Sequence, residues 1–135
     1  MAKQILFKQE ALDKLALGAQ KLNDAVTITM GAKGQNVLIE GSFGAGLPHI
    51  TKDGVTVAKS VELKDVVENT ACTLVKNVSL MTNAAVGDGS TSSISLANAV
   101  IQYGRRAIIE DNVHPIMLKR GLDIQLQEVL RELEK

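Results

Sequence analysis

The sequence has few aromatic residues, a single cysteine and no net charge. Phe7, Phe43 and Tyr103 are its only aromatic residues, so a platform for stacked nucleic-acid bases is not expected. The 15 basic and 15 acidic residues cancel, which removes the electrostatic attraction that a nucleic acid or an anionic membrane would need. Cys72 has no partner for an intrachain disulfide, and its place in an apolar helical pattern predicts a buried, inert thiol.

Long apolar runs are also missing. No stretch approaches the roughly 20 apolar residues of a membrane-spanning helix. Residues 1–8 lack the apolar core of a signal peptide. We therefore expect a cytoplasmic protein with no membrane partner. A chain of 135 residues is long enough for one ordinary domain.

Apolar residues recur at helical spacing over most of the chain, which predicts a mainly α fold. Helices are expected over residues 9–30, 55–60, 64–85 and 90–109, and a last helix opens at His114-Pro115. The 90–109 helix is apolar on most sides, as expected of a central, buried helix. The cleanest apolar stripe lies on the 64–85 helix and consists of Val67, Ala71, Leu74, Val78, Met81 and Ala85.

Short β elements are predicted near the start of the chain. Ile5–Phe7 is too short to be stable alone, so we expect it to pair with another strand. Residues 36–40 and 49–51 flank a glycine-rich loop, and together they predict a loose hairpin.

Residues 86–93 place one carboxylate between two glycines, with four hydroxyl residues following at once. A helix is predicted directly behind them, and the unpaired N–H groups and dipole of a helix N-terminus favour phosphate. The Asp88 carboxylate would repel that phosphate unless a divalent cation lay between them. The segment therefore predicts a phosphate held with Mg²⁺, most plausibly from a nucleotide. Plain capping of the helix is the alternative for the same residues.

Two further turns contain glycine: residues 29–34 and residues 51–54. None of the three turns matches a P-loop or a full dinucleotide-binding fingerprint, so neither class of enzyme is supported. Taken singly, Gly31 could end the first helix in a left-handed conformation, and Asp53 could be a turn residue or a helix cap. Taken together, the turns supply the backbone donors, lysines and aspartates that phosphoryl transfer requires.

The order of these segments resembles the group I chaperonins, the GroEL-type family. The similarity runs in register along the whole chain. Its most specific parts are Thr29-Met30-Gly31-Ala32-Lys33-Gly34-Gln35-Asn36-Val37, Ser42-Phe43-Gly44-Ala45, Ile50-Thr51-Lys52-Asp53-Gly54-Val55, Gly87-Asp88-Gly89-Ser90-Thr91 and Leu118-Lys119-Arg120-Gly121-Leu122-Asp123.

The resemblance implies a fold and an assembly. Residues 1–135 correspond to the first part of the equatorial, ATP-binding domain, a helical bundle with a small β-hairpin and an N-terminal edge strand; the intermediate and apical domains are absent from the sequence. The Ile5–Phe7 strand and the residue 36–51 hairpin would pair between neighbouring subunits of a ring. Identical or full-length chaperonin subunits are the implied partners, with non-native polypeptide and a co-chaperonin for the full-length protein.

The resemblance also assigns site residues position by position. Asp88 would hold Mg²⁺, and Asp53 would act as the catalytic residue that helps to position the attacking water. The ATP contacts would come from Thr29, Met30, Gly31, Ala32, Lys52, Asp88, Gly89, Ser90, Thr91 and Ser92.

Several positions depart from the family pattern. Ala32 stands where proline is usual, Gln35 where a basic residue is usual, and Ser90 and Ser92 where threonines are usual. Serine keeps the hydroxyl, so phosphate binding should survive with a looser fit. The loop at residues 44–49 is longer than usual, which bears on the contact between subunits.

The implied function is that of an ATP-dependent protein-folding chaperone subunit. The family's further catalytic aspartate has no counterpart after Asp88, so we expect weak or no ATPase activity from the 135-residue chain. A truncated, non-catalytic paralogue that assembles with or modulates a full-length ring is the alternative.

Overall fold

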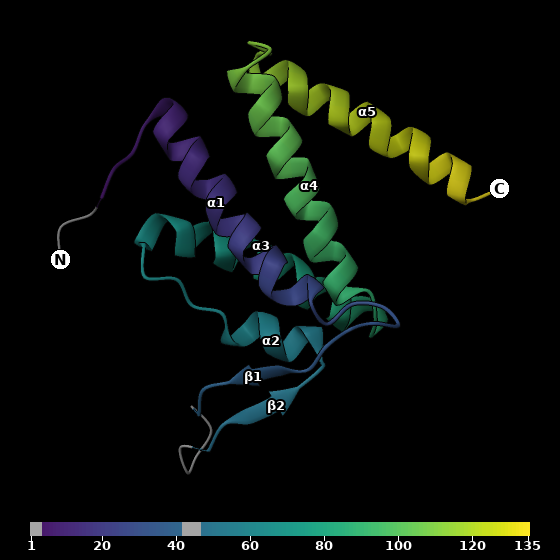
Figure 1. Cartoon of the computed structure of the whole chain (residues 1–135). Coiled ribbons are helices and arrows are strands. Elements are labelled where there is room, and N and C mark those ends of the chain that lie inside the picture. The colour runs from purple at the N-terminus through teal and green to yellow at the C-terminus, as the bar shows by residue number, and fades with distance from the viewer. Residues whose placement is uncertain (1–3, 42–46) are drawn as a thin grey trace. The chain divides into compact units, whose positions relative to one another are not determined.

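A computed structural model describes residues 4–41 and 47–135 of the chain (Figure 1). Its contacts divide into two units, Met1–Ile101 and Gln102–Lys135, which are described separately below. The described residues are mainly helical with one small antiparallel sheet, which confirms the expected fold class. The elements are α1 (Lys8–Thr27), β1 (Val37–Ile39), β2 (His49–Thr51), α2 (Gly54–Ser60), α3 (Val66–Val86), α4 (Ser90–Ile109) and α5 (Pro115–Leu133).

The core of the first unit is built from α1, α2, α3 and the first half of α4. On α1, the apolar residues Ala19, Leu22 and Val26 are fully buried. Cys72 on α3 is buried as expected, and burial raises the pKa of its thiol. The cluster consists of Ala19, Leu22, Val26, Val57, Ala58, Cys72, Val75 and Ile94.

The apolar stripe predicted for the 64–85 helix does not coincide with the face that the structure buries, so this prediction was wrong. Leu74 and Met81 are 60% and 72% exposed. The buried residues of α3 are Glu68, Ala71, Cys72, Val75 and Ser79. Ala71, Cys72 and Ser79 on this face are small, which allows α1 to approach closely. The distance between the two helices, and not the hydrophobicity of the side chains, therefore decides which face of α3 is buried.

The α4 helix spans its predicted residues, but the expectation that it is buried was wrong for this chain. Its buried residues are Ser90, Ile94 and Asn98, one position every four along a single face. Leu96 and Val100, on other faces, are 69% and 50% exposed among the described residues.

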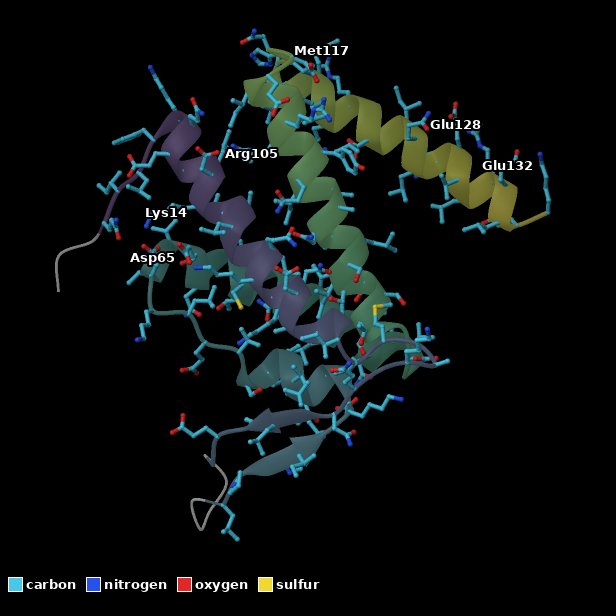
Figure 2. All side chains as sticks on the ribbon, in the orientation of Figure 1. Lys14, Asp65, Arg105, Met117, Glu128 and Glu132 are labelled. Carbon is cyan, nitrogen blue, oxygen red and sulfur yellow. The ribbon has the colours of Figure 1, made fainter. Side chains whose placement is uncertain are left out.

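The closest approach between α1 and α3 is at Gly18. A methyl group on Gly18 would overlap the carbonyl oxygen of Glu68 and would lie 2.8 Å from its carbonyl carbon. Two ion pairs flank this crossing: Lys14 with Asp65, labelled in Figure 2, and Lys21 with Glu68 at 2.5 Å. The crossing is therefore fixed by a glycine contact and by charge on both sides of it.

Asp65 serves both as the N-cap of α3 and as the partner of Lys14. Its Oδ1 accepts hydrogen bonds from the N–H groups of Val67 and Glu68 at 3.0 and 3.1 Å. The hydrogen bond from Lys14, followed by the backbone bonds, holds the pKa of Asp65 below its usual value.

We expect the stability lost in the Asp65→Asn variant to depend on pH. Because the pKa of Asp65 is lower in the folded state, its charge stabilises the fold above the unfolded carboxyl pKa of about 4, and this stabilisation disappears as the pH falls through the folded value. Asparagine keeps the cap acceptor but not the ion pair. Urea unfolding should therefore show a gap between wild type and variant at pH 7 that closes at pH values well below 4. A gap of constant size at every pH would contradict this account.

The N-terminal segment does not form the predicted edge strand within the described chain. Residues 4–7 carry no strand assignment, and Ile5 and Phe7 are 69% and 72% exposed. Pairing of this segment between subunits remains a prediction. The hairpin is confirmed: Val37 lies opposite Thr51 and Ile39 opposite His49, while residues 42–46 of the predicted loop lie outside the described residues.

The second unit contains the end of α4 and the helix α5. As predicted, His114 and Pro115 open α5, and His114 Nδ1 accepts a hydrogen bond from the N–H of Ile116 at 3.3 Å. No residue of α5 is buried, so its apolar side chains, Leu122, Leu126 and Leu133 among them, are exposed in the described chain. None of the described helices has the length and apolar character needed to cross a membrane.

Candidate functional site

The three glycine-containing turns meet at Gly54, the first residue of α2. Gly54 is buried, and a methyl group on it would overlap Thr91 Oγ1 and would lie 3.4 Å from Thr29 Oγ1. Thr29 follows the end of α1 and Thr91 lies in the first turn of α4. The structure therefore brings the 29–34, 51–54 and 86–93 turns together at one point, with two hydroxyl groups facing one glycine.

α1 ends at Thr27, three residues earlier than predicted, and the 29–34 turn follows it. The N–H groups of Thr29 and Met30 bond the carbonyls of Val26 and Thr27, which tightens the last turn and ends the helix. Thr29 is only 7% exposed, and its hydroxyl donates to the carbonyl of Val26 at 2.7 Å. Gly31 is left-handed at φ +70°, but it does not end the first helix as interpreted, because α1 ends at Thr27 and its C-cap is Ile28.

Two contacts hold this turn against its neighbours. The Ser95 hydroxyl on α4 donates to the sulfur of Met30 at 3.8 Å. A methyl group on Gly34 would lie 2.8 Å from Lys52 Cε, so the aliphatic part of Lys52 lies close against Gly34. Gly31 and Ala32 are exposed between these contacts, which leaves their backbone accessible to a ligand.

Asp53 is the N-cap of α2, as one of its sequence interpretations required. Its Oδ2 accepts from the N–H of Thr56 at 2.8 Å and from the hydroxyl of Thr56 at 2.5 Å. The Asp53 N–H donates to Thr51 Oγ1 at 3.0 Å. The hydrogen bond from the Thr56 hydroxyl is the largest influence on the pKa of Asp53; with the backbone N–H groups and Lys59, it outweighs partial burial and holds that pKa below its usual value. The side chain is thus an ionised carboxylate at neutral pH.

The 86–93 turn joins α3 to α4 through two left-handed glycines. Gly87 ends α3 and is left-handed at φ +79°. Gly89, at φ +77°, directly precedes α4, and its carbonyl accepts a hydrogen bond from the N–H of Ser93 at 2.9 Å. Asp88 Oδ1 accepts at 2.7 Å from the N–H of Gly89, its immediate neighbour, and not from an N–H inside α4. This bond is not a helix cap, and the exposed carboxylate of Asp88 is presented beside the start of α4.

The donors at this turn suit a magnesium ion that is shared with phosphate. Among residues 4–41 and 47–135, no group of three or more His, Cys, Asp or Glu side chains could hold a metal ion alone. Mg²⁺ is commonly bound by one or two carboxylates, with waters and substrate phosphates completing the shell. One exposed aspartate beside the helix start at Ser90 and the exposed Ser92 fits that mode of binding.

Sequence reasoning missed several residues of this region. Gly54 was expected only as part of a turn, although its close contact with Thr91 is what allows the turns to meet. Thr56 was not considered, although a hydroxyl residue three positions after a predicted Asp cap is a recognisable spacing. Ser95 lies one helical turn beyond Thr91 and had no signal in the sequence pattern.

The chain matches the TCP-1/cpn60 chaperonin family over residues 22–135, a span that contains all three turns. It therefore belongs to the TCP-1/cpn60 chaperonin family. Membership implies a chaperonin-type role in protein folding, with subunits that assemble into oligomeric rings and bind substrate polypeptides.

Proposed function

We propose that the chain binds Mg²⁺-ATP where its three turns meet, as the first part of the equatorial domain of a group I chaperonin. The contact of Gly54 with Thr91 and Thr29 carries this proposal. It joins two helix starts, whose unpaired N–H groups can bind phosphate, to the turn that follows the end of α1. Each turn alone would be an ordinary connection.

The proposed roles follow the position of each side chain. Thr29, Met30, Gly31 and Ala32 would contact the nucleotide from the end of α1, with Lys52 beside Gly34. Gly89, Ser90, Thr91 and Ser92 would surround phosphates at the start of α4. Asp88 would hold Mg²⁺, which neutralises phosphate charge when bound.

Asp53 is the proposed catalytic residue. As an ionised carboxylate it can accept a hydrogen bond from a water molecule and so orient the water oxygen toward the γ-phosphorus. The water oxygen would bond to the γ-phosphorus while the bond from that phosphorus to the bridging oxygen breaks, giving ADP and phosphate. In a homo-oligomeric, cytoplasmic ring, ATP binding and hydrolysis would drive opening and closing around non-native polypeptide.

Replacing Asp88 with alanine tests the metal site. We expect Asp88→Ala to weaken ATP binding at least about tenfold when Mg²⁺ is present, because a bound metal needs this charged ligand. In the presence of a chelator this loss should disappear, and the variant should bind ATP at least as tightly as the wild type, because the carboxylate that repels phosphate is gone. Isothermal titration calorimetry, with and without Mg²⁺, measures both quantities.

Asp111→Ala is the matched control for this experiment. Asp111 is also exposed and also lies between two helices, but it follows α4 instead of preceding it. The Asp111→Ala variant should bind Mg²⁺-ATP with the same affinity as the wild type. Equal affinities of Asp88→Ala and wild type for Mg²⁺-ATP would rule out the proposed metal site, and absence of binding by the wild type would rule out the nucleotide site itself.

A further inference from the structure

Asp53 is held from both sides by threonines. Thr51, at the end of β2, accepts from its N–H, and Thr56, inside α2, donates two hydrogen bonds to its carboxylate. A helix cap requires only the bond from the Thr56 N–H. The second bond, from the Thr56 hydroxyl at 2.5 Å, goes beyond what capping needs.

Both bonds from Thr56 end on the same oxygen, Oδ2. They fix the rotation of the carboxylate, since a charge-assisted hydrogen bond is about twice as strong as a neutral one. Oδ1 receives neither bond from Thr56, and the Val55 N–H is a further backbone donor to this carboxylate. Oδ1 would therefore be the oxygen that faces a water molecule.

We propose that Thr56 is a positioning residue that holds the Asp53 carboxylate through its hydroxyl, so that Oδ1 faces the attacking water. The inference rests on the proposed function for its catalytic consequence. The hydrogen bonds from Thr56 to Asp53 are present in the chain without nucleotide, so they can be tested there.

Thr56→Val removes the hydroxyl while keeping the shape of the side chain, and it leaves the N–H cap bond in place. Thr56→Ser restores the hydroxyl without the methyl group. Thr70→Val is the matched control, because the Thr70 hydroxyl donates only to the carbonyl of Val66 on its own helix. Lys59, the charged residue that also lowers the pKa of Asp53, is unchanged in all three variants.

Three measurements apply to the 135-residue chain. Carbon-13 NMR follows the titration of the Asp53 carboxyl carbon in nucleotide-free protein. Single-turnover hydrolysis, with protein in excess over ATP, reports the chemical step even when it is slow. Affinity for a non-hydrolysable ATP analogue is measured on the same variants.

In Thr56→Val, the Asp53 titration should move to higher pH and the single-turnover rate should fall about tenfold, within the roughly 10²-fold that a misplacement of about 1 Å can cost. Its affinity for the analogue should stay within about twofold of wild type, because a positioning residue acts on the chemical step. Thr56→Ser and Thr70→Val should match the wild type in every measurement.

An unmoved Asp53 titration in Thr56→Val would overturn the inference whether or not the chain binds ATP. A moved titration with a wild-type hydrolysis rate would overturn the positioning role. A wild type that does not bind the analogue would instead count against the proposed function, while the titration still decides whether Thr56 holds Asp53.

Discussion

Gly54→Ala is expected to weaken Mg²⁺-ATP binding by more than about tenfold and to lower stability by about 1–3 kcal/mol, the usual cost of overpacking. The new methyl group would overlap Thr91 Oγ1, whereas Thr29 Oγ1 would lie at an ordinary contact distance of 3.4 Å. Relief requires α2 to move away from α4, which separates the turns that would surround the phosphates. Calorimetry with Mg²⁺-ATP and urea unfolding measure the two effects.

A second substitution tests whether steric overlap with Thr91, and not a change in backbone freedom at position 54, causes the loss of stability. Thr91→Ala removes the overlapping hydroxyl and leaves Thr91 Cβ at an acceptable 3.4 Å from the new methyl group. Gly54→Ala/Thr91→Ala should therefore recover most of the lost stability. Gly121→Ala, at a helical position with open space around it, should be neutral or stabilising. If the double variant were no more stable than Gly54→Ala, the contact with Thr91 would not be the cause.

Gly18→Ala should be the most damaging single change to the fold. Alanine in the middle of a helix is favoured over glycine by about 1 kcal/mol. At Gly18 this gain is outweighed, because the methyl group would overlap the Glu68 carbonyl oxygen and would lie within 2.9 Å of two backbone carbons. Backbone cannot rotate away as a side chain can, so we expect a net loss of about 3 kcal/mol or a failure to fold.

Circular dichroism during urea unfolding tests this expectation. Gly104→Ala is the comparison, since its methyl group would meet only Leu118 Cδ2 at an ordinary 3.6 Å. A stability gain in both variants would show that helix propensity, and not the approach of α1 to α3, decides the outcome at Gly18.

The helix boundaries followed from local chemistry and could be predicted. His114 and Pro115 open α5, and the hairpin strands lie within a residue of their expected limits. The end of α1 was missed by three residues because Thr29 and Met30 bond tightly to carbonyls three residues back. Periodicity shows that a segment is a helix but not where its last turn tightens.

The buried face of α3 could not be predicted from periodicity. Leu74 and Met81 belong to the more regular stripe, yet the helix buries the side that carries Cys72 and Val75. That choice depends on how closely α1 approaches, which is set by Gly18 in another segment. Hydrophobicity along one helix contains no information about the distance to another.

The site was predicted in its residue types and missed in its arrangement. Asp53, Asp88 and the hydroxyl residues after it were identified because phosphate and Mg²⁺ require donors and carboxylates in turns. Their meeting point could not be derived, since Thr29, Gly54 and Thr91 are far apart in sequence and meet only through tertiary packing. Thr56 was missed because its bond to Asp53 depends on α2 starting at Gly54.

The contact between Gly54 and Thr91 also constrains how this sequence can change over evolutionary time. A residue larger than glycine fits at position 54 only if position 91 loses its γ atoms first. The two positions are therefore expected to vary jointly across relatives, with glycine at 54 wherever a hydroxyl residue stands at 91. Change at position 54 alone should be rare, even in relatives that tolerate serine for threonine elsewhere in the turn.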